Sequence, residues 1–277
     1  MTLSARNYIL KAGMLFSLFC LVICIVASIQ AIPVYASMEA EVTRRPGGIF
    51  QVFFGDILDA KLLAVNSSIL ALIVYSIVSM VFVYIFFEKT QSPEILFVVF
   101  FVASFSPETL RLILPLGQVY EIPSLYALMA SRIILFTRNF GIFSLFVASV
   151  FAAGYEAQRQ RNFIVFVVVI ALVIALGVPI DTYAWDSSLK MVTGYVPMFR
   201  LIETGLVLIT AVSFFIAAWT RGSREYNIIG SGSVLAFLGR NILLNTDTWA
   251  VLPLGFALLA AGTWLICINL HKIYMWL

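Results

Sequence analysis

The sequence predicts an all-α protein: a polytopic membrane bundle of about eight transmembrane helices, with residues 1–277 forming a single integral membrane domain. Hydrophobic residues make up 62% of the 277 residues and charged residues only 11%, which is more apolar surface than a soluble domain can bury. Several apolar runs reach the ~20 residues that cross about 30 Å of hydrocarbon as a helix. These runs are continuous rather than alternating in hydropathy, which excludes a transmembrane barrel.

Hydropathy along the chain divides it into eight candidate spans. The seventh, IIGSGSVLAFLGRNILLN, is the weakest because it contains two serines, an arginine and two asparagines. If it does not cross, the bundle has seven helices. The expected spans are 8–36, 62–87, 95–117, 124–153, 163–185, 196–219, 228–246 and 249–274.

The first span and the loop after it each allow two interpretations. Arg6 and Lys11 precede an apolar stretch that ends in VYA at Ala36, as in a cleaved signal peptide. That stretch is long for a signal peptide, so we expect an uncleaved first helix; cleavage of residues 1–36 would leave seven. Residues 37–61 are expected to form an outer loop, and their second half, 49–61, suits either a short amphipathic helix in the membrane interface or an extension of the second span.

Positive charge sets the expected orientation, with both termini in the cytoplasm and the bundle in the cell membrane. Eight basic residues fall on the inner side and four on the outer side, as the positive-inside rule requires. The inner loops YEAQRQRN and TRGSREYN carry most of this bias, whereas the outer segments DTYAWDSSLK and NTDTW hold aromatic residues suited to interface anchors.

Charged residues inside the spans are the candidates for a functional site. Charge at mid-bilayer costs ~2.5 kcal/mol or more, so these side chains should face protein or water and find partners. In SFSPETLRLILPLG, Pro107 removes a backbone donor, and Glu108 and Arg111 follow it, so the helix break and the charges share one place. Arg200 and Glu203 have the same spacing on one helical face. The predicted ligand-binding residues are Arg138, Arg240, Arg200, Arg111, Arg132, Glu108, Glu203 and Asn241.

The charge balance of this cluster predicts its ligand. Five arginines face two glutamates, or three acids if Asp181 takes part, and we expect an anionic small molecule or a lipid head group to neutralise the surplus. The alternative is structural: each arginine pairs with a glutamate, extends to the head groups or caps a broken helix. The glutamates are expected to be partners of arginine rather than proton carriers, and Asp181 to lie in an exposed loop.

Other chemistries lack their residues in this sequence. Cys20, Cys24 and Cys267 lie within apolar runs, which predicts neither a disulfide framework nor a metal site, and no cofactor is expected. The GSGS stretch near residue 230 does not have the spacing of a serine-hydrolase motif, and no third group supports a dyad with His271. The net charge of +3 is spread over the loops, so a nucleic-acid partner is not expected.

These observations predict a sensory or accessory module rather than an enzyme. It would bind its anion or lipid head group from the outer side, among membrane lipids, and act on a cytoplasmic or membrane partner protein. The first alternative is a transporter or channel for an anion, an anionic metabolite or a lipid. The second is a lipid-modifying enzyme with Glu108 and Glu203 as acid–base groups. The apolar runs below the cluster, such as FGIFSLFVASVF, favour binding without transport.

Overall fold

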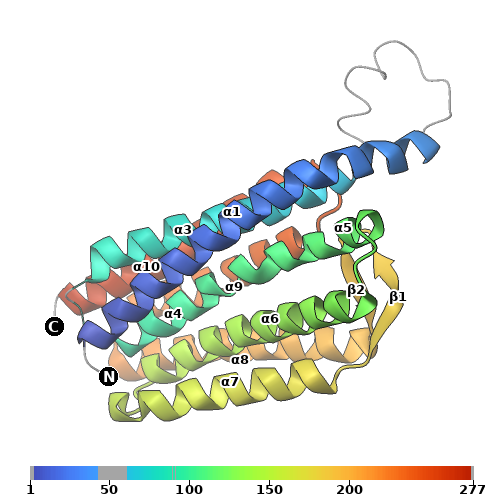
Figure 1. Cartoon of the computed structure of the whole chain (residues 1–277). Coiled ribbons are helices and arrows are strands. Elements are labelled where there is room, and N and C mark those ends of the chain that lie inside the picture. Colours follow the sequence, from blue (N-terminus) through green and yellow to red (C-terminus); the bar gives the residue numbers. More distant parts are fainter. Residues whose placement is uncertain (1–2, 43–60, 89, 91, 276–277) are drawn as a thin grey trace.

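A computed structural model describes residues 3–42, 61–88, 90 and 92–275 of the chain (Figure 1). Within these residues, eight helices are long and apolar enough to cross a membrane. The predicted all-α bundle and its eight spans are therefore confirmed, and the chain has the character of a multi-pass membrane protein. The elements are α1 (Leu3–Val42), α3 (Lys61–Phe87), α4 (Pro93–Ala103), η1 (Ser106–Leu112), α5 (Ile113–Val119), α6 (Ser124–Ala152), η2 (Ala157–Arg159), α7 (Gln160–Gly177), β1 (Ile180–Asp186), β2 (Lys190–Thr193), α8 (Val196–Arg221), α9 (Glu225–Asn245) and α10 (Leu252–Met275).

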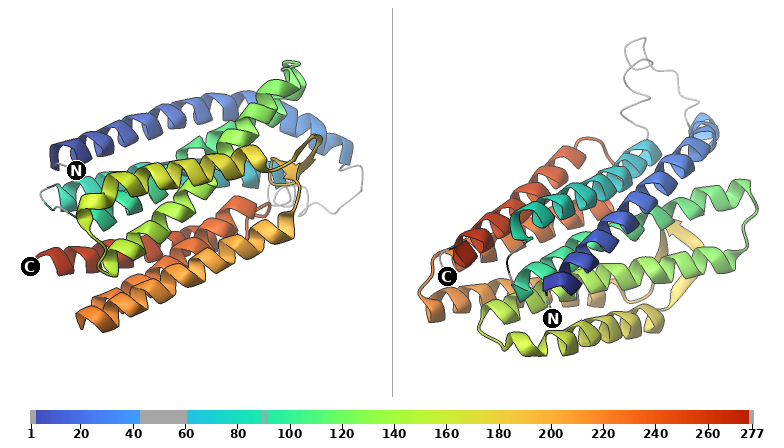
Figure 2. Two further views of the ribbon diagram at one scale, coloured as in Figure 1. Left: turned by 90° about the horizontal axis from the view of Figure 1, so that it is seen from below. Right: turned by 60° about the vertical axis from the view of Figure 1, so that its left-hand side comes forward.

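Successive spans run in opposite directions, so the bundle has two distinct ends (Figures 1 and 2). Both ends of the chain lie at one of them, called here the termini end. The two-stranded sheet lies at the other, called the hairpin end. The helices pack mainly as the neighbours α1–α3, α4–α6, α6–α8, α8–α9 and α9–α10, and α7 lies at the edge against α6.

The third span is interrupted at the predicted place. α4 ends at Ala103, the 3-10 helix η1 follows, and α5 resumes the span at Ile113. Pro107 has no amide hydrogen to continue the helical pattern. The hydroxyl of Ser76 donates to the carbonyl of Val102 (2.9 Å), which satisfies an acceptor beside the break. The interruption turns Glu108 and Arg111 into the protein interior, where both are buried.

The seventh span forms α9 despite its weak hydropathy, because it packs unusually close to α10. A Cβ atom added at Gly262 would lie 2.4 Å from the backbone nitrogen of Ala236, and one added at Gly239 would lie 2.3 Å from that of Leu259. Only glycine permits backbones to approach so closely. The serine hydroxyl groups of this span keep hydrogen-bond partners inside the helix, since Ser231 and Ser233 each donate to a main-chain oxygen one turn earlier.

The fifth span is shorter than predicted. The expectation was a helix over 163–185, but α7 ends at Gly177 and residues 180–193 form an antiparallel hairpin. Pro179 disfavours helical continuation, and the aromatic and β-branched residues beyond it favour strands. The first helix continues to Val42, beyond the expected end at residue 36. The predicted interfacial helix at 49–61 lies, except for residue 61, outside the described residues.

The apolar core fills the termini end of the bundle. Large buried rings from α4, α6 and α8 meet there, including Phe97, Phe151 and Phe214. The rings of Phe97 and Phe151 stack with their centroids 5.5 Å apart. At the hairpin end, a second apolar cluster that includes Val65 and Leu112 packs α1 and α3 against η1, while charged side chains surround a cavity beside it.

Candidate functional site

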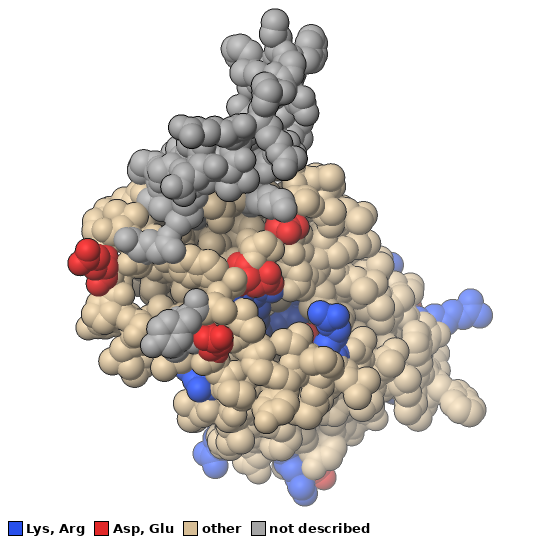
Figure 3. Space-filling model, turned by 90° about the vertical axis from the view of Figure 1, so that its right-hand side faces the viewer, with Lys and Arg blue, Asp and Glu red and all other residues tan. Residues whose placement is uncertain are grey.

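A cavity of about 540 Å³ opens at the hairpin end, between η1 and α5, α6, α8, α9 and the hairpin. Figure 3 shows this end of the molecule, with basic and acidic side chains gathered around a hollow. The charged residues that line the cavity are Arg111, Arg138, Asp186, Lys190, Arg200 and Glu203, and the lining amides are Asn139, Asn241 and Asn245.

Glu108 and Arg138 form the central ion pair of the site. The Arg138 Nε and Nη2 atoms donate to the two carboxylate oxygens of Glu108, each at 2.6 Å. The Glu108 side chain is 1% exposed and that of Arg138 14%. A two-point contact of this kind fixes both planes and is stronger than a single hydrogen bond. This ion pair therefore links the break at η1 to the middle of α6.

Arg111 shares the same carboxylate but is not fully satisfied by it. Its Nη1 atom lies 3.5 Å from Glu108 Oε2, and its Nη2 atom donates to the main-chain oxygen of Ser188 in the hairpin turn. Its Nε atom has no hydrogen-bond partner among the described residues, although the residue is only 1% exposed. Buried donors are rarely left without a partner, so Arg111 retains a donor for a further acceptor.

Arg240 lies directly behind Arg138. Its Nη2 atom donates to the Arg138 main-chain oxygen (3.0 Å), while its Nη1 atom has no hydrogen-bond partner within the described part of the chain. The residue is 1% exposed and is not itself part of the cavity lining. Its buried charge raises the positive potential at the cavity floor.

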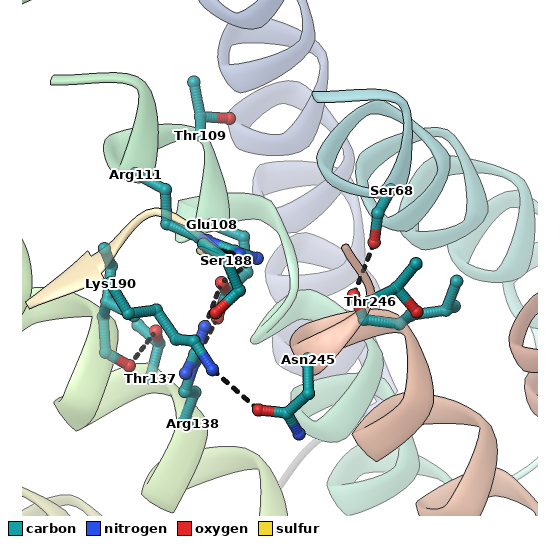
Figure 4. A network of polar contacts seen from close by, with 12 residues as sticks. Ser68, Glu108, Thr109, Arg111, Thr137, Arg138, Ser188, Lys190, Asn245 and Thr246 are labelled. Atoms are coloured by element: carbon teal, nitrogen blue, oxygen red, sulfur yellow. Dashed lines mark hydrogen bonds and ion pairs between the residues drawn. The ribbon is translucent and has the colours of Figure 1, made fainter. Parts of the chain in front are cut away.

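The hairpin supplies a cation that sequence reasoning placed in a loop. Lys190 donates from Nζ to Asn245 Oδ1 at 2.6 Å and so ties β2 to the end of α9 (Figure 4). Burial, and then the nearby charges of Arg138 and Arg111, lower the pKa of Lys190 to about 7. The signal that could have found it is the segment TYAWDSSLKMVT, in which strand-forming residues flank a turn of aspartate and serine.

Arg132 makes the contacts expected of the structural alternative, in which an arginine caps the end of a helix. Its Nη1 atom donates to the main-chain oxygens of Ala175 (2.5 Å), Leu176 (3.0 Å) and Val178 (2.5 Å) at the end of α7. A cation at the carboxyl end of a helix is favourable. Arg132 does not line the cavity, so the structure separates it from the other predicted site residues.

The remaining predicted residues are brought to the cavity with fewer contacts. Arg200 and Glu203 line it from one face of α8, as their spacing predicts. No salt bridge joins them among the described residues, and Arg200 is exposed. Asn241 lines the cavity from α9. Asp181 lies exposed at the start of β1 and is not part of the lining.

An apolar plug lies beneath the cavity. Ile142, Val207 and Phe237 form one buried cluster, contributed by α6, α8 and α9. Each is one helical turn from a residue of the charged site: Ile142 follows Arg138 by four positions, and Val207 follows Glu203 by four. Below the charged layer, the three helices are therefore in direct apolar contact.

The charge of the site is positive. With Lys190 protonated, five cations lie in the cavity wall or directly behind it, namely Arg111, Arg138, Lys190, Arg200 and Arg240, and they face the three carboxylates Glu108, Asp186 and Glu203. Within the described ranges, no group of three histidine, cysteine or acidic side chains is arranged to hold a metal ion. No protein-family model matches the chain, and no curated protein is significantly similar to it.

Proposed function

We propose that the protein binds an anionic ligand in the hairpin-end cavity and acts as a sensory or accessory module. The observation that carries this proposal is Arg111: it is buried, lines the cavity and keeps an unsatisfied Nε donor. Its one carboxylate partner, Glu108, is already held at both oxygens by Arg138. A buried guanidinium with a free N–H group favours an oxyanion as the missing acceptor.

The plug supports binding rather than transport. A carrier needs a polar route from the site to the other side of the membrane, which transporters build from interrupted helices near the bilayer midplane. Here Ile142, Val207 and Phe237 close the bundle under the cavity, and the phenylalanine-rich core continues beyond them. An enzyme is disfavoured as well, because Glu108 is engaged by two arginines and is a poor acid or base.

The distribution of basic residues supports a cytoplasmic termini end in a cell membrane. Among the described basic residues that lie outside the interior of the spans, seven belong to the termini end, against Lys61 and Lys190 at the hairpin end. This is the bias of the positive-inside rule. The ligand then enters from outside, and a partner protein is contacted at the cytoplasmic or membrane surface. The seven are Arg6, Lys11, Arg159, Arg161, Arg221, Arg224 and Lys272.

The test is ligand-dependent thermal stability of the purified protein in detergent. The probes are chloride, sulfate, inorganic phosphate, acetate, citrate and phosphatidylglycerol. We expect at least one anion to raise the melting temperature of the wild type, because a ligand that binds only the folded state stabilises it. Arg138→Gln removes the central cation and should abolish that shift. Arg159→Gln, in an exposed ion pair with Glu156, is the matched control and should retain it.

A second variant protects the test against misfolding. Arg138→Gln leaves Glu108 with one cation fewer, and the protein could fail to fold for that reason alone. Arg200 is exposed and makes no salt bridge with the described residues. Arg200→Gln should therefore fold and still weaken anion binding. If no anion shifts the wild type, or if Arg200→Gln and Arg138→Gln both retain the full shift, the proposal is wrong. Uptake into liposomes of an anion that binds would favour the transporter alternative.

A further inference from the structure

The cavity has an apolar wall as well as a cationic one, and the two differ in depth. α6 begins at Ser124 at the hairpin end, and its lining residues Ala127, Ala130, Ile134 and Arg138 form a single stripe. At 1.5 Å per residue, Arg138 lies ~16 Å farther along the helix than Ala127 and ~6 Å farther than Ile134. Along this wall, the apolar side chains are shallow and the cation is deep.

The third span shows the same order. Arg111 and Leu114 both line the cavity, and Leu114 lies one turn nearer the hairpin end. On the opposite wall Lys190 is bonded to Asn245 at 2.6 Å, and Arg200, near the start of α8, is exposed. An unsatisfied donor is found instead at depth, on Arg111.

This order is the reverse of a membrane lipid in its leaflet. A lipid has its charged head at the membrane surface and its chains toward the middle, whereas the wall formed by α6 and the third span is apolar near the surface and cationic toward the middle. The volume of about 540 Å³ suits one compact organic ligand. A lipid head group placed against α6 would meet apolar side chains where its charge must lie, and the shallow cations Lys190 and Arg200 belong to the opposite wall.

We propose that the ligand is a small amphiphilic acid, a carboxylate or phosphate joined to a compact apolar group, which enters head first from the hairpin end. This rests on the anion site proposed above and specifies its ligand class. The oxyanion meets Arg111 and Arg138, and the apolar group packs along Ala127, Ala130 and Ile134. The acid and the apolar group are thus both recognised, each by its own wall.

The experiment compares acids that differ only in their apolar part. Binding of acetate, butyrate and hexanoate, and of inorganic phosphate and phenyl phosphate, is measured by isothermal titration with the protein in nanodiscs of neutral lipid. Each added methylene should strengthen binding about fourfold, which corresponds to ~0.8 kcal/mol of apolar burial, so the four methylenes that separate hexanoate from acetate should strengthen binding by about 250-fold if all are buried. Heats measured with empty nanodiscs are subtracted to remove partitioning into lipid.

A matched pair of variants locates the apolar wall. Ala127→Leu fills the shallow end of the cavity and should remove most of the gain from acetate to hexanoate, while acetate itself binds as before. Ala257 is an exposed residue of α10 that does not line the cavity, so Ala257→Leu should leave the whole series unchanged. Thermal stability of both variants without ligand checks that each is folded.

The outcomes separate this inference from the function on which it rests. If no probe binds and anionic lipid has no effect, both proposals fail. If acetate and hexanoate bind equally, or inorganic phosphate as well as phenyl phosphate, the anion site stands and the amphiphilic class is wrong. If only nanodiscs with phosphatidylglycerol stabilise the protein, or if Ala127→Leu binds hexanoate as the wild type does, the head-first arrangement is wrong.

Discussion

The two halves of the bundle are made from the same helices but are filled in opposite ways. α6 crosses both: its first half lines the cavity and presents Arg138 to Glu108, and its second half packs Phe151 against Phe97 in the apolar core. The third span is likewise apolar through α4, apart from Glu94 in its first turn, and charged at η1. The change occurs within about one turn of the layer that contains Ile142 and Val207.

We infer from this difference that the charged half is retained for binding rather than for stability. Burying an ion pair in place of apolar side chains is often neutral or unfavourable, because desolvation offsets the attraction. The aromatic core between α4, α6 and α8 shows that these helices can be packed with apolar residues, although the termini end also buries Arg6 and Glu94 at its rim. Charges are therefore expected to be retained at the hairpin end for what they bind, and the following predictions test that contrast from the largest effect to the smallest.

Glu108→Gln should have the largest effect. It leaves Arg111 and Arg138 without their shared carboxylate, with the buried Arg240 directly behind them. Breaking a buried pair in this way costs ~3–5 kcal/mol of unfolding free energy. Glu156→Gln is the control, since it breaks an exposed pair with Arg159 and should cost no more than ~1 kcal/mol. Both are measured by unfolding titration in mixed micelles, and equal losses would contradict the central role of Glu108.

Gly262→Ala should come next, because it tests packing rather than charge. The added methyl group would lie 2.4 Å from the backbone nitrogen of Ala236, and a backbone cannot yield as a side chain does. Forced overpacking costs ~1–3 kcal/mol. Gly205→Ala is the control, since nothing lies within 4 Å of its added carbon, and its better helix propensity should be neutral or stabilising. A stable Gly262→Ala protein would show that α9 and α10 separate easily.

The sequence predicts the two halves unequally. Hydropathy and basic loops are properties of single segments, so the eight spans and the broken third helix could be predicted, as could the proximity of Glu108 and Arg111, which lie one turn apart. The Glu108–Arg138 contact joins residues 30 positions apart, and only the packing of α6 on η1 decides that Arg138, and not another arginine, is the partner.

Two features of the hairpin end were missed for a physical reason. The apolar character of the fifth span continues past residue 177, so hydropathy alone does not reveal that Pro179 ends the helix and a hairpin follows. Lys190 then appears as a loop residue, although the hairpin returns it to the cavity. The contacts of Arg132 are not encoded in any side-chain pattern either, because its acceptors are main-chain oxygens at the end of α7.

We expect Lys190 to make anion binding pH-dependent. If a bound anion raises the pKa of Lys190 by one unit, the affinity for that anion is about tenfold higher when Lys190 is charged than when it is neutral. Its pKa in the fold is lowered to about 7 from 10.5 by burial and by Arg138 and Arg111, and is partly restored by Glu108 and Asp186. Below pH 7 Lys190 is charged and adds a cation to the site, so anions should bind more tightly at pH 6 than at pH 8.5.

The same shift sets the direction of stability. Between pH 7 and 10.5 the unfolded chain holds a proton on Lys190 that the fold does not, so stability should rise with pH across this window. Below pH 7 both states are protonated, and the cost of the buried charge is complete. Lys190→Gln can still donate to Asn245 and should remove both pH dependences. If anion titrations at pH 6 and 8.5 differ equally in wild type and Lys190→Gln, another group is responsible.

Arg132→Gln should have the smallest effect and divides the arginines by role. Arg132 and Arg138 lie on the same helix within two turns, yet one donates to the carbonyls at the end of α7 and the other to Glu108 beside the cavity. Loss of a cation from a helix end costs ~1 kcal/mol, so Arg132→Gln should lower the melting temperature slightly and leave anion affinity unchanged. Arg138→Gln, the identical substitution six residues later, should instead abolish the anion-dependent shift.

Titration of both variants with the same anion is the measurement. Equal losses of affinity would mean that anion binding depends on the total positive charge around the cavity and not on particular arginines. The assignment of binding to Arg111 and Arg138 would then be wrong.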